Sequence, residues 1–145
     1  MFNVHRLCVL AALTLACMPT MAQEAQVLRD IDGPDRTTLT KEQLDQLLPG
    51  ASMGRITAKG NLHLWKNEPG GSFVVSSDNR GSSTGLASSA SGKWHISDDG
   101  RYCVLMEWKS GSEEWCRFIM KTGQGYYSAK SDKATEKVYK LTISK

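Results

Sequence analysis

The feature that most constrains this fold is a succession of short strand-like segments joined by short turns. Their side chains alternate in polarity or are β-branched, as in strands that bury one face. Short connections between such segments favour antiparallel hairpins. We therefore expect a mainly β protein whose antiparallel sheet folds as a barrel or a sandwich. Residues 76–92 are rich in Ser and Gly and are expected to form a long loop with at most a ragged strand inside it. The expected strands are residues 54–58, 61–66, 72–77, 93–97, 101–108, 114–121, 126–130 and 137–144.

One short helix is predicted before the first strand. Thr40 and Gln43 have the spacing of a capping box, in which each side chain bonds the backbone N–H of the other residue. Leucines at 44, 47 and 48 form one apolar stripe, and Pro49-Gly50 ends the helix. A helix this short is not stable alone in water, so its leucines must pack on the sheet.

Two cysteines lie in neighbouring predicted strands. Following the pleat, Cys103 shares a face with Leu105, and Cys116 shares a face with Phe118. Both cysteines can therefore point to one side of a hairpin, and we expect a Cys103–Cys116 disulfide. Two free thiols or a metal pair are the alternatives, and the absence of a C-x-x-C motif argues against them.

The opposite face of this hairpin is also apolar, with Tyr102, Trp108 and Trp115 on it. These residues, together with Trp65 on an earlier strand, are the candidate ligand-binding or partner-binding residues, because aromatic side chains often anchor interfaces. The alternative is that they belong to the core. For Tyr102 the core is the better interpretation, whereas Trp108 at the hairpin tip fits both.

The N-terminal stretch is typical of a secretory signal peptide. Arg6 supplies a positive charge, residues 7–17 form an apolar run too short to cross a bilayer, and the small residues before position 23 predict cleavage after Ala22. A lipoprotein anchor at Cys17 is the alternative, and the residues before it fit that pattern less well. We expect a periplasmic or secreted protein with a signal peptide at 1–22, a flexible lead-in at 23–38 and a single β-rich domain at 39–145.

Charge and hydropathy exclude two classes of partner. The formal net charge of the chain is +3, and its Lys and Arg residues are not clustered, so nothing favours nucleic acid. No second long apolar run follows the N-terminal one, so we expect no integral membrane segment after processing.

The sequence contains no catalytic or metal-binding set. Residues 81–85 match the G-x-S-x-G pattern around Ser83, but that pattern needs a preceding strand and a following helix, and a Ser/Gly-rich loop produces it by chance. His63 and His95 each have apolar neighbours on both sides, so both are expected to face solvent or a wet sheet surface. No further metal ligands accompany them at suitable spacing, and we expect no metal and no cofactor.

Several short motifs carry a resemblance to a known family. They are Gly92-x-Trp94-x-Ile96, Asp99-Gly100-Arg101-x-Cys103, Trp115-Cys116-Arg117 and Tyr126-Tyr127. With the helix that ends in Leu48-Pro49-Gly50, they make the chain resemble a family of small secreted proteobacterial proteins of unknown function. The resemblance implies a bacterial periplasmic or secreted β-domain and carries over no catalytic residues.

The function that fits these observations best is non-enzymatic binding. A disulfide-braced sheet with aromatic faces predicts a module that recognises a protein or a cell-envelope component, of the inhibitor or immunity type, with Trp108 as its anchor. A lipocalin-like small-ligand carrier is the first alternative, and a cavity lined by Trp65, Trp94 and Tyr127 would favour it. A small hydrolase is the second, and it would need a histidine within hydrogen-bond reach of Ser83.

Overall fold

The computed structural model describes residues 26–145, so the expected signal peptide at 1–22 and the alternative anchor at Cys17 lie outside the described residues. The described part holds the 3-10 helix η1 (Leu28–Ile31), the α-helix α1 (Lys41–Leu47) and nine strands. The strands are β1 (Thr37–Thr38), β2 (Ser52–Ile56), β3 (Leu62–Lys66), β4 (Ser72–Ser77), β5 (Ser88–Ile96), β6 (Tyr102–Trp108), β7 (Gly111–Thr122), β8 (Gly125–Ala129) and β9 (Tyr139–Ser144).

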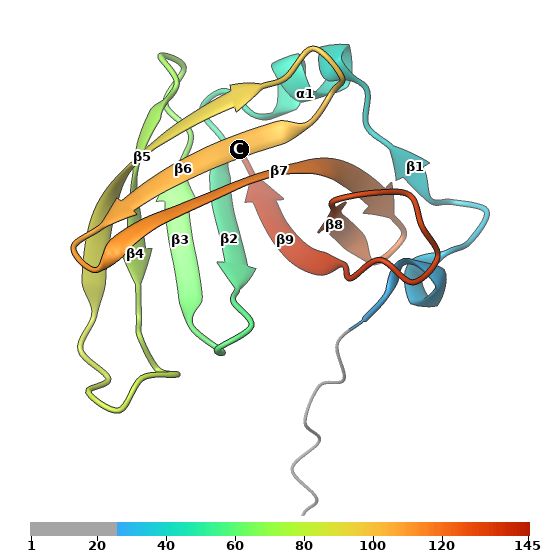
Figure 1. The fold of residues 1–145 in the computed structure, drawn as a ribbon. Helices are drawn as coiled ribbons and strands as arrows, with labels where there is room; N and C mark the ends of the chain where they lie inside the picture. The colour runs from blue at the N-terminus through green and yellow to red at the C-terminus, as the bar shows by residue number, and fades with distance from the viewer. Residues whose placement is uncertain (1–25) are drawn as a thin grey trace, which may run out of the picture.

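Strands β2 to β9 form a closed antiparallel barrel. Each strand pairs with the next along the chain, and β9 returns to pair with β2. Closure leaves these strands without a free sheet edge over their paired length. The short strand β1 pairs with β7 outside this ring. The expectation of a mainly β antiparallel barrel with one short helix is confirmed, and the up-and-down order is that of a lipocalin-like barrel (Figure 1).

Strand β5 is longer than the sequence predicts. The loop expected at residues 76–92 spans only residues 78–87, because the chain from Ser88 onward pairs with β4. One of the small residues that made this segment look like a loop, Gly92, has a packing role. At Gly92 an added Cβ would lie 2.1 Å from the Phe73 ring, so the ring occupies the space that any side chain would need.

Helix α1 closes one end of the barrel. The Thr40 and Gln43 side chains form the expected capping box at its start. Leu44 and Leu48 are fully buried among the inward-facing residues of the upper half of the barrel. Figure 1 shows α1 at the top, with the β2–β3 turn and the β4–β5 loop at the opposite end. This apolar core also contains Met53, Trp65, Phe73, Val75, Trp94, Tyr102, Val104, Met106, Trp115, Ile119 and Leu141.

A buried amide links the helix to two strands. Asn67, which has no exposed surface, accepts hydrogen bonds through Oδ1 from Trp65 Nε1 at 3.1 Å and from the Tyr102 hydroxyl at 2.7 Å. Its Nδ2 donates to the carbonyl oxygen of Leu48 at 3.3 Å. Buried polar groups are tolerated only when they are paired in this way. Burial raises the pKa of Tyr102, so its hydroxyl keeps its proton and remains a donor to the amide.

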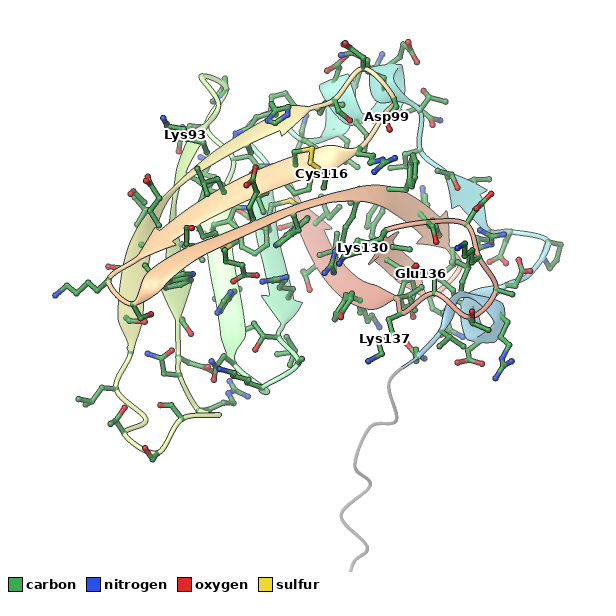
Figure 2. The ribbon with its side chains drawn as sticks, in the orientation of Figure 1. Lys93, Asp99, Cys116, Lys130, Glu136 and Lys137 are labelled. Atoms are coloured by element: carbon green, nitrogen blue, oxygen red, sulfur yellow. A yellow bond between two sulfur atoms is a disulfide. The ribbon has the colours of Figure 1, made fainter. Side chains whose placement is uncertain are left out.

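The expected disulfide is confirmed. Cys103 and Cys116 are directly opposite each other in the β6–β7 ladder, and their sulfur atoms are 2.05 Å apart. The bond lies on the outer face of the wall, beside the half-buried Leu105 and Phe118 (Figure 2).

The segment expected to be a flexible lead-in packs against the barrel from residue 26 onward. Leu28 N donates to the Glu136 carbonyl at 2.8 Å, and Val138 N donates to the Gln26 carbonyl at 3.0 Å. The Leu28 side chain is buried in a second, smaller apolar cluster outside the barrel wall, with Met120, Tyr127, Ala129 and Val138. The polar composition of residues 23–38 hid these few apolar anchors.

Within residues 26–145, no helix combines the length and the apolar character that crossing a membrane requires.

We expect the double variant Cys103→Ser/Cys116→Ser to fold with reduced stability. Removing a cross-link between residues 13 positions apart should lower the free energy of unfolding by about 3 kcal/mol, because the unfolded chain regains loop entropy. Urea denaturation of the oxidised wild type and of the double variant measures the loss. Equal midpoints would show that the bond does not stabilise the fold.

We expect Asn67→Leu to lower the free energy of unfolding by about 2–4 kcal/mol, because it removes the buried acceptor of the Tyr102 hydroxyl and the amide donor to the Leu48 carbonyl. Tyr102→Phe, which removes one of these groups, should cost about 1–2 kcal/mol. Since the two residues share a hydrogen bond, the double variant should lose less than the sum of the single losses. A double-mutant cycle by chemical denaturation tests this coupling, and strict additivity would refute it.

Candidate functional site

The barrel is open at the end opposite α1, and its interior there forms a chamber of about 1220 Å³. The upper half of the barrel is filled by apolar side chains, so the chamber occupies the lower half. We call it the lower chamber. Inward-facing strand residues and turn residues both contribute to its lining. The inward-facing strand residues are Arg55, His63, Ser77, Ser88, Trp108, Glu113, Arg117 and Tyr139. Ser89 lies next to Ser88 at the edge of the chamber, and the turn residues include Thr57, Lys59, Asn61, Asn79, Ser82, Thr84 and Lys109.

Two buried arginines reach into the lower chamber from different strands. Arg55 on β2 and Arg117 on β7 are each only 7% exposed. The central carbon of each guanidinium group lies 5.1 Å from the centre of the Trp115 ring. That of Arg117 also lies 4.1 Å from the Tyr139 ring. Aromatic faces stabilise such cations in part, but they do not accept the in-plane N–H hydrogen bonds of a guanidinium group.

The chamber has an excess of positive charge. Arg55 Nη2 forms an ion pair with Glu113 Oε1 across the interior. Glu113 is the one acidic residue among the lining residues, whereas Arg55, Lys59, Lys109 and Arg117 are basic. Arg55 Nε and two nitrogens of Arg117, Nε and Nη1, are buried with no hydrogen-bond partner. Burial and the charge of Arg55 lower the pKa of Arg117 from its ordinary range.

His63 corrects an expectation from the sequence. It was expected to face solvent or a wet sheet surface, but it is 5% exposed and lies inside the barrel, with its ring centre 5.1 Å from that of Trp108. His63 points inward because Trp65, which shares its face of β3, is buried in the core. Leu64, between them, therefore lies on the outer face. Burial, together with the charge of Arg55, lowers the pKa of His63, so the imidazole is neutral near pH 7. His95 lies on the exposed face of β5, as predicted.

Of the four aromatic candidates, only Trp108 lines the lower chamber. It is half-buried, whereas Tyr102, Trp115 and Trp65 are buried in the apolar core. The four therefore do not form an exposed aromatic platform, because the face of the β6–β7 hairpin that carries Tyr102, Trp108 and Trp115 is the barrel interior.

The cavity suggested for a carrier also has a different lining. Trp65 and Trp94 belong to the apolar core, and Tyr127 faces the outer cluster beside Leu28. The alternation along β8 explains the position of Tyr127, because Ser128 and Ile119, which are opposite each other in the ladder, occupy the inward positions.

The Ser83 motif lacks the structural context of a nucleophile in the described part. Residues 81–85 lie on the β4–β5 loop between two antiparallel strands, and no hydrogen bond in residues 26–145 joins Ser83 to a histidine. The context that a nucleophile on this pattern needs is absent there. Across the same residues, no group of three or more His, Cys, Asp or Glu side chains could hold a metal ion.

Sequence reasoning missed Arg55, Glu113 and Arg117. A signal for Arg117 was present, because the pleat places it on the apolar face with Trp115 and Ile119. A charged residue in an otherwise apolar alternation indicates either an edge or a functional interior. Arg55 gave no such signal, because β2, with the sequence Ser-Met-Gly-Arg-Ile, shows no clear alternation of apolar and polar residues.

Comparison of the chain with family models, with curated proteins and with solved structures finds no match.

We expect the stability of the protein to fall as the pH is lowered through the range in which histidine gains a proton. Because the pKa of His63 is lowered in the folded state, the unfolded chain binds more protons in this range, and acid favours unfolding. The free energy of unfolding should therefore drop between about pH 7.5 and about pH 5.5.

His63→Gln should flatten this dependence, whereas His95→Gln, on the exposed face of β5, should follow the wild type. Urea titrations at a series of pH values measure the difference. A His63→Gln profile parallel to that of the wild type would contradict the assignment.

Proposed function

We propose that this protein is a lipocalin-like carrier that binds a small molecule in the lower chamber. The observation that carries the proposal is an open chamber inside a closed barrel wall, with buried polar groups left without partners. Ligand sites are concave, largely preformed and lined by a few convergent polar groups. The chamber has the size of such a site, at about 1220 Å³.

A carrier is favoured over the recognition of a protein or cell-envelope component by the positions of the aromatic side chains. Flat interfaces need anchors on the outer surface. Here Trp108 lies at the chamber and the other three candidates lie in the core. The same placement favours binding over catalysis, because the chamber contains cations and hydroxyl groups but no nucleophile paired with a base. We therefore propose a non-enzymatic role.

Export and family membership are part of the same proposal. The Cys103–Cys116 bond supports a periplasmic or secreted location, because disulfides persist in oxidising compartments. The motifs on which the resemblance to small secreted proteobacterial proteins is proposed include residues at the disulfide and at the chamber. In Trp115-Cys116-Arg117, the cysteine forms the disulfide on the outer face, and the side chains of its two neighbours point inward. Trp115 lies in the apolar core, and Arg117 lines the chamber.

A chamber-filling substitution tests the carrier proposal. A library of small organic acids, sugars, lipids and neutral compounds is first screened for ligands that raise the melting temperature of the wild type, since a ligand that binds the folded state stabilises it. Ser88→Trp places an indole in the chamber and should weaken the affinity of any hit at least about tenfold by occupying its space.

Ser76→Trp is the matched control, because Ser76 lies on the adjacent strand β4 with its side chain on the outer face. It should bind as the wild type does. Circular dichroism confirms that both variants are folded. The carrier proposal fails if no compound stabilises the wild type, or if Ser88→Trp binds every hit as tightly as Ser76→Trp does.

A further inference from the structure

The most unusual feature of the lower chamber is a pair of buried guanidinium groups of which only one, that of Arg55, forms an ion pair with a carboxylate. Burying a charge without a partner costs several kcal/mol, so buried arginines are normally paired. Glu113 neutralises Arg55, and none of the ion pairs found in residues 26–145 involves Arg117. Three buried guanidinium nitrogens therefore face the interior without an acceptor.

The rest of the lining has a consistent character. Its turn residues add Lys59 and Lys109, and most of its other side chains end in hydroxyl or amide groups, such as Ser77, Ser88 and Asn79. Such a lining suits a hydroxylated ligand better than a hydrocarbon chain, because hydroxyl groups of a ligand can exchange hydrogen bonds with it. Trp108 supplies one flat apolar ring, on which the face of a small ring compound can rest.

We propose that Arg55 and Arg117 bind the acidic group of a hydroxylated organic anion, of the sugar-acid or sugar-phosphate class, in the lower chamber. This inference rests on the proposed carrier function and specifies the ligand. Guanidinium groups match the geometry of both carboxylate and phosphate oxygens, so the two arginines can bind either kind of acidic group. The bound anion supplies acceptors for Nε and Nη1 of Arg117, which are buried without a hydrogen-bond partner. His63 is the neutral neighbour on the same wall, packed on Trp108.

Glu113 sets the selectivity of the pair. Its carboxylate already occupies Arg55, so an incoming anion meets Arg117 first and competes with Glu113 for Arg55. Removing the Glu113 charge should therefore strengthen anion binding. A purely structural role of the ion pair predicts the opposite, because loss of the pair would only loosen the fold.

Isothermal titration calorimetry with four probes tests the proposal on the full mature chain. D-glucuronate and D-glucose 6-phosphate carry the anionic group and the hydroxyl groups, D-glucose lacks the charge, and hexanoate lacks the hydroxyl groups. We expect at least one of the two sugar anions to bind at least about tenfold more tightly than glucose and hexanoate do, which corresponds to one well-made charged contact. The ratio between the two sugar anions then distinguishes a carboxylate ligand from a phosphate ligand.

Three variants connect the preference to the arginines. Arg117→Met should remove the preference for the anion over glucose, and Glu113→Gln should raise the affinity for the anion, which a folding defect cannot do. Lys93→Met removes one positive charge from the exposed outer face of β5 (Figure 2) and should leave binding unchanged.

Equal affinities for glucuronate, glucose 6-phosphate and glucose would overturn the proposed anion site while leaving the carrier function intact. Tighter binding of hexanoate than of either sugar anion would overturn the hydroxylated class. If the library screen yields a neutral ligand that Ser88→Trp excludes, and no anionic probe binds, the arginine proposal is wrong and the carrier proposal stands. If neither experiment yields a ligand, the carrier proposal itself fails.

Discussion

The hydrogen bonds that converge on Asn67 hold together the parts of the molecule on which the remaining structure depends. The amide lies just after β3 and joins the end of α1, the Trp65 indole and the Tyr102 hydroxyl on β6. Its backbone extends the link, because Asn67 N donates to the Ala51 carbonyl and its own carbonyl accepts from Gly50 N. A polar centre of this kind admits only one arrangement of helix and barrel, since any other leaves buried groups unpaired. The upper half is thereby filled with packed side chains, and the lower half is left as the chamber.

The two halves of the barrel differ in the side chains that their strands point inward. Inward positions near α1 carry large apolar side chains, and inward positions further along the same strands carry Arg55, His63 and Arg117. The apolar half supplies the burial that stabilises the fold. The polar half reduces that stability, because it takes charged groups out of water without fully pairing them. A small barrel maintains such an arrangement only when a ligand or some other interaction repays the cost, which is why the chamber is the best guide to function.

The overall fold was predictable from local signals, whereas the candidate site was not. Turn spacing and alternation predicted all eight barrel strands, and the capping residues at Thr40 and Gln43 predicted the start of α1. Closure depends on the pairing of β9 with β2, whose partner residues are 86 to 92 positions apart in the sequence, and such a contact leaves no local signature. The same limitation applies to the chamber. Alternation places Arg55 and Glu113 each on one face of its own strand, but only barrel closure brings the two charges together across the interior. The prediction for His63 was wrong because its apolar neighbour Leu64 favours the inward position when only adjacent residues are compared. In the folded protein the burial of Trp65 decides which face of β3 points inward.

The Cys103–Cys116 bond has a consequence that reaches through the wall. Cys116 lies on the outer face between Trp115 and Arg117, whose side chains point inward. A slip of one residue along β7 would exchange its two faces, moving the arginine to the outside and the cysteine to the inside. The covalent link to β6 forbids that slip, because the two cysteines must remain opposite each other. The disulfide thus acts as a register lock, and it fixes the side of the barrel on which the positive charge is presented.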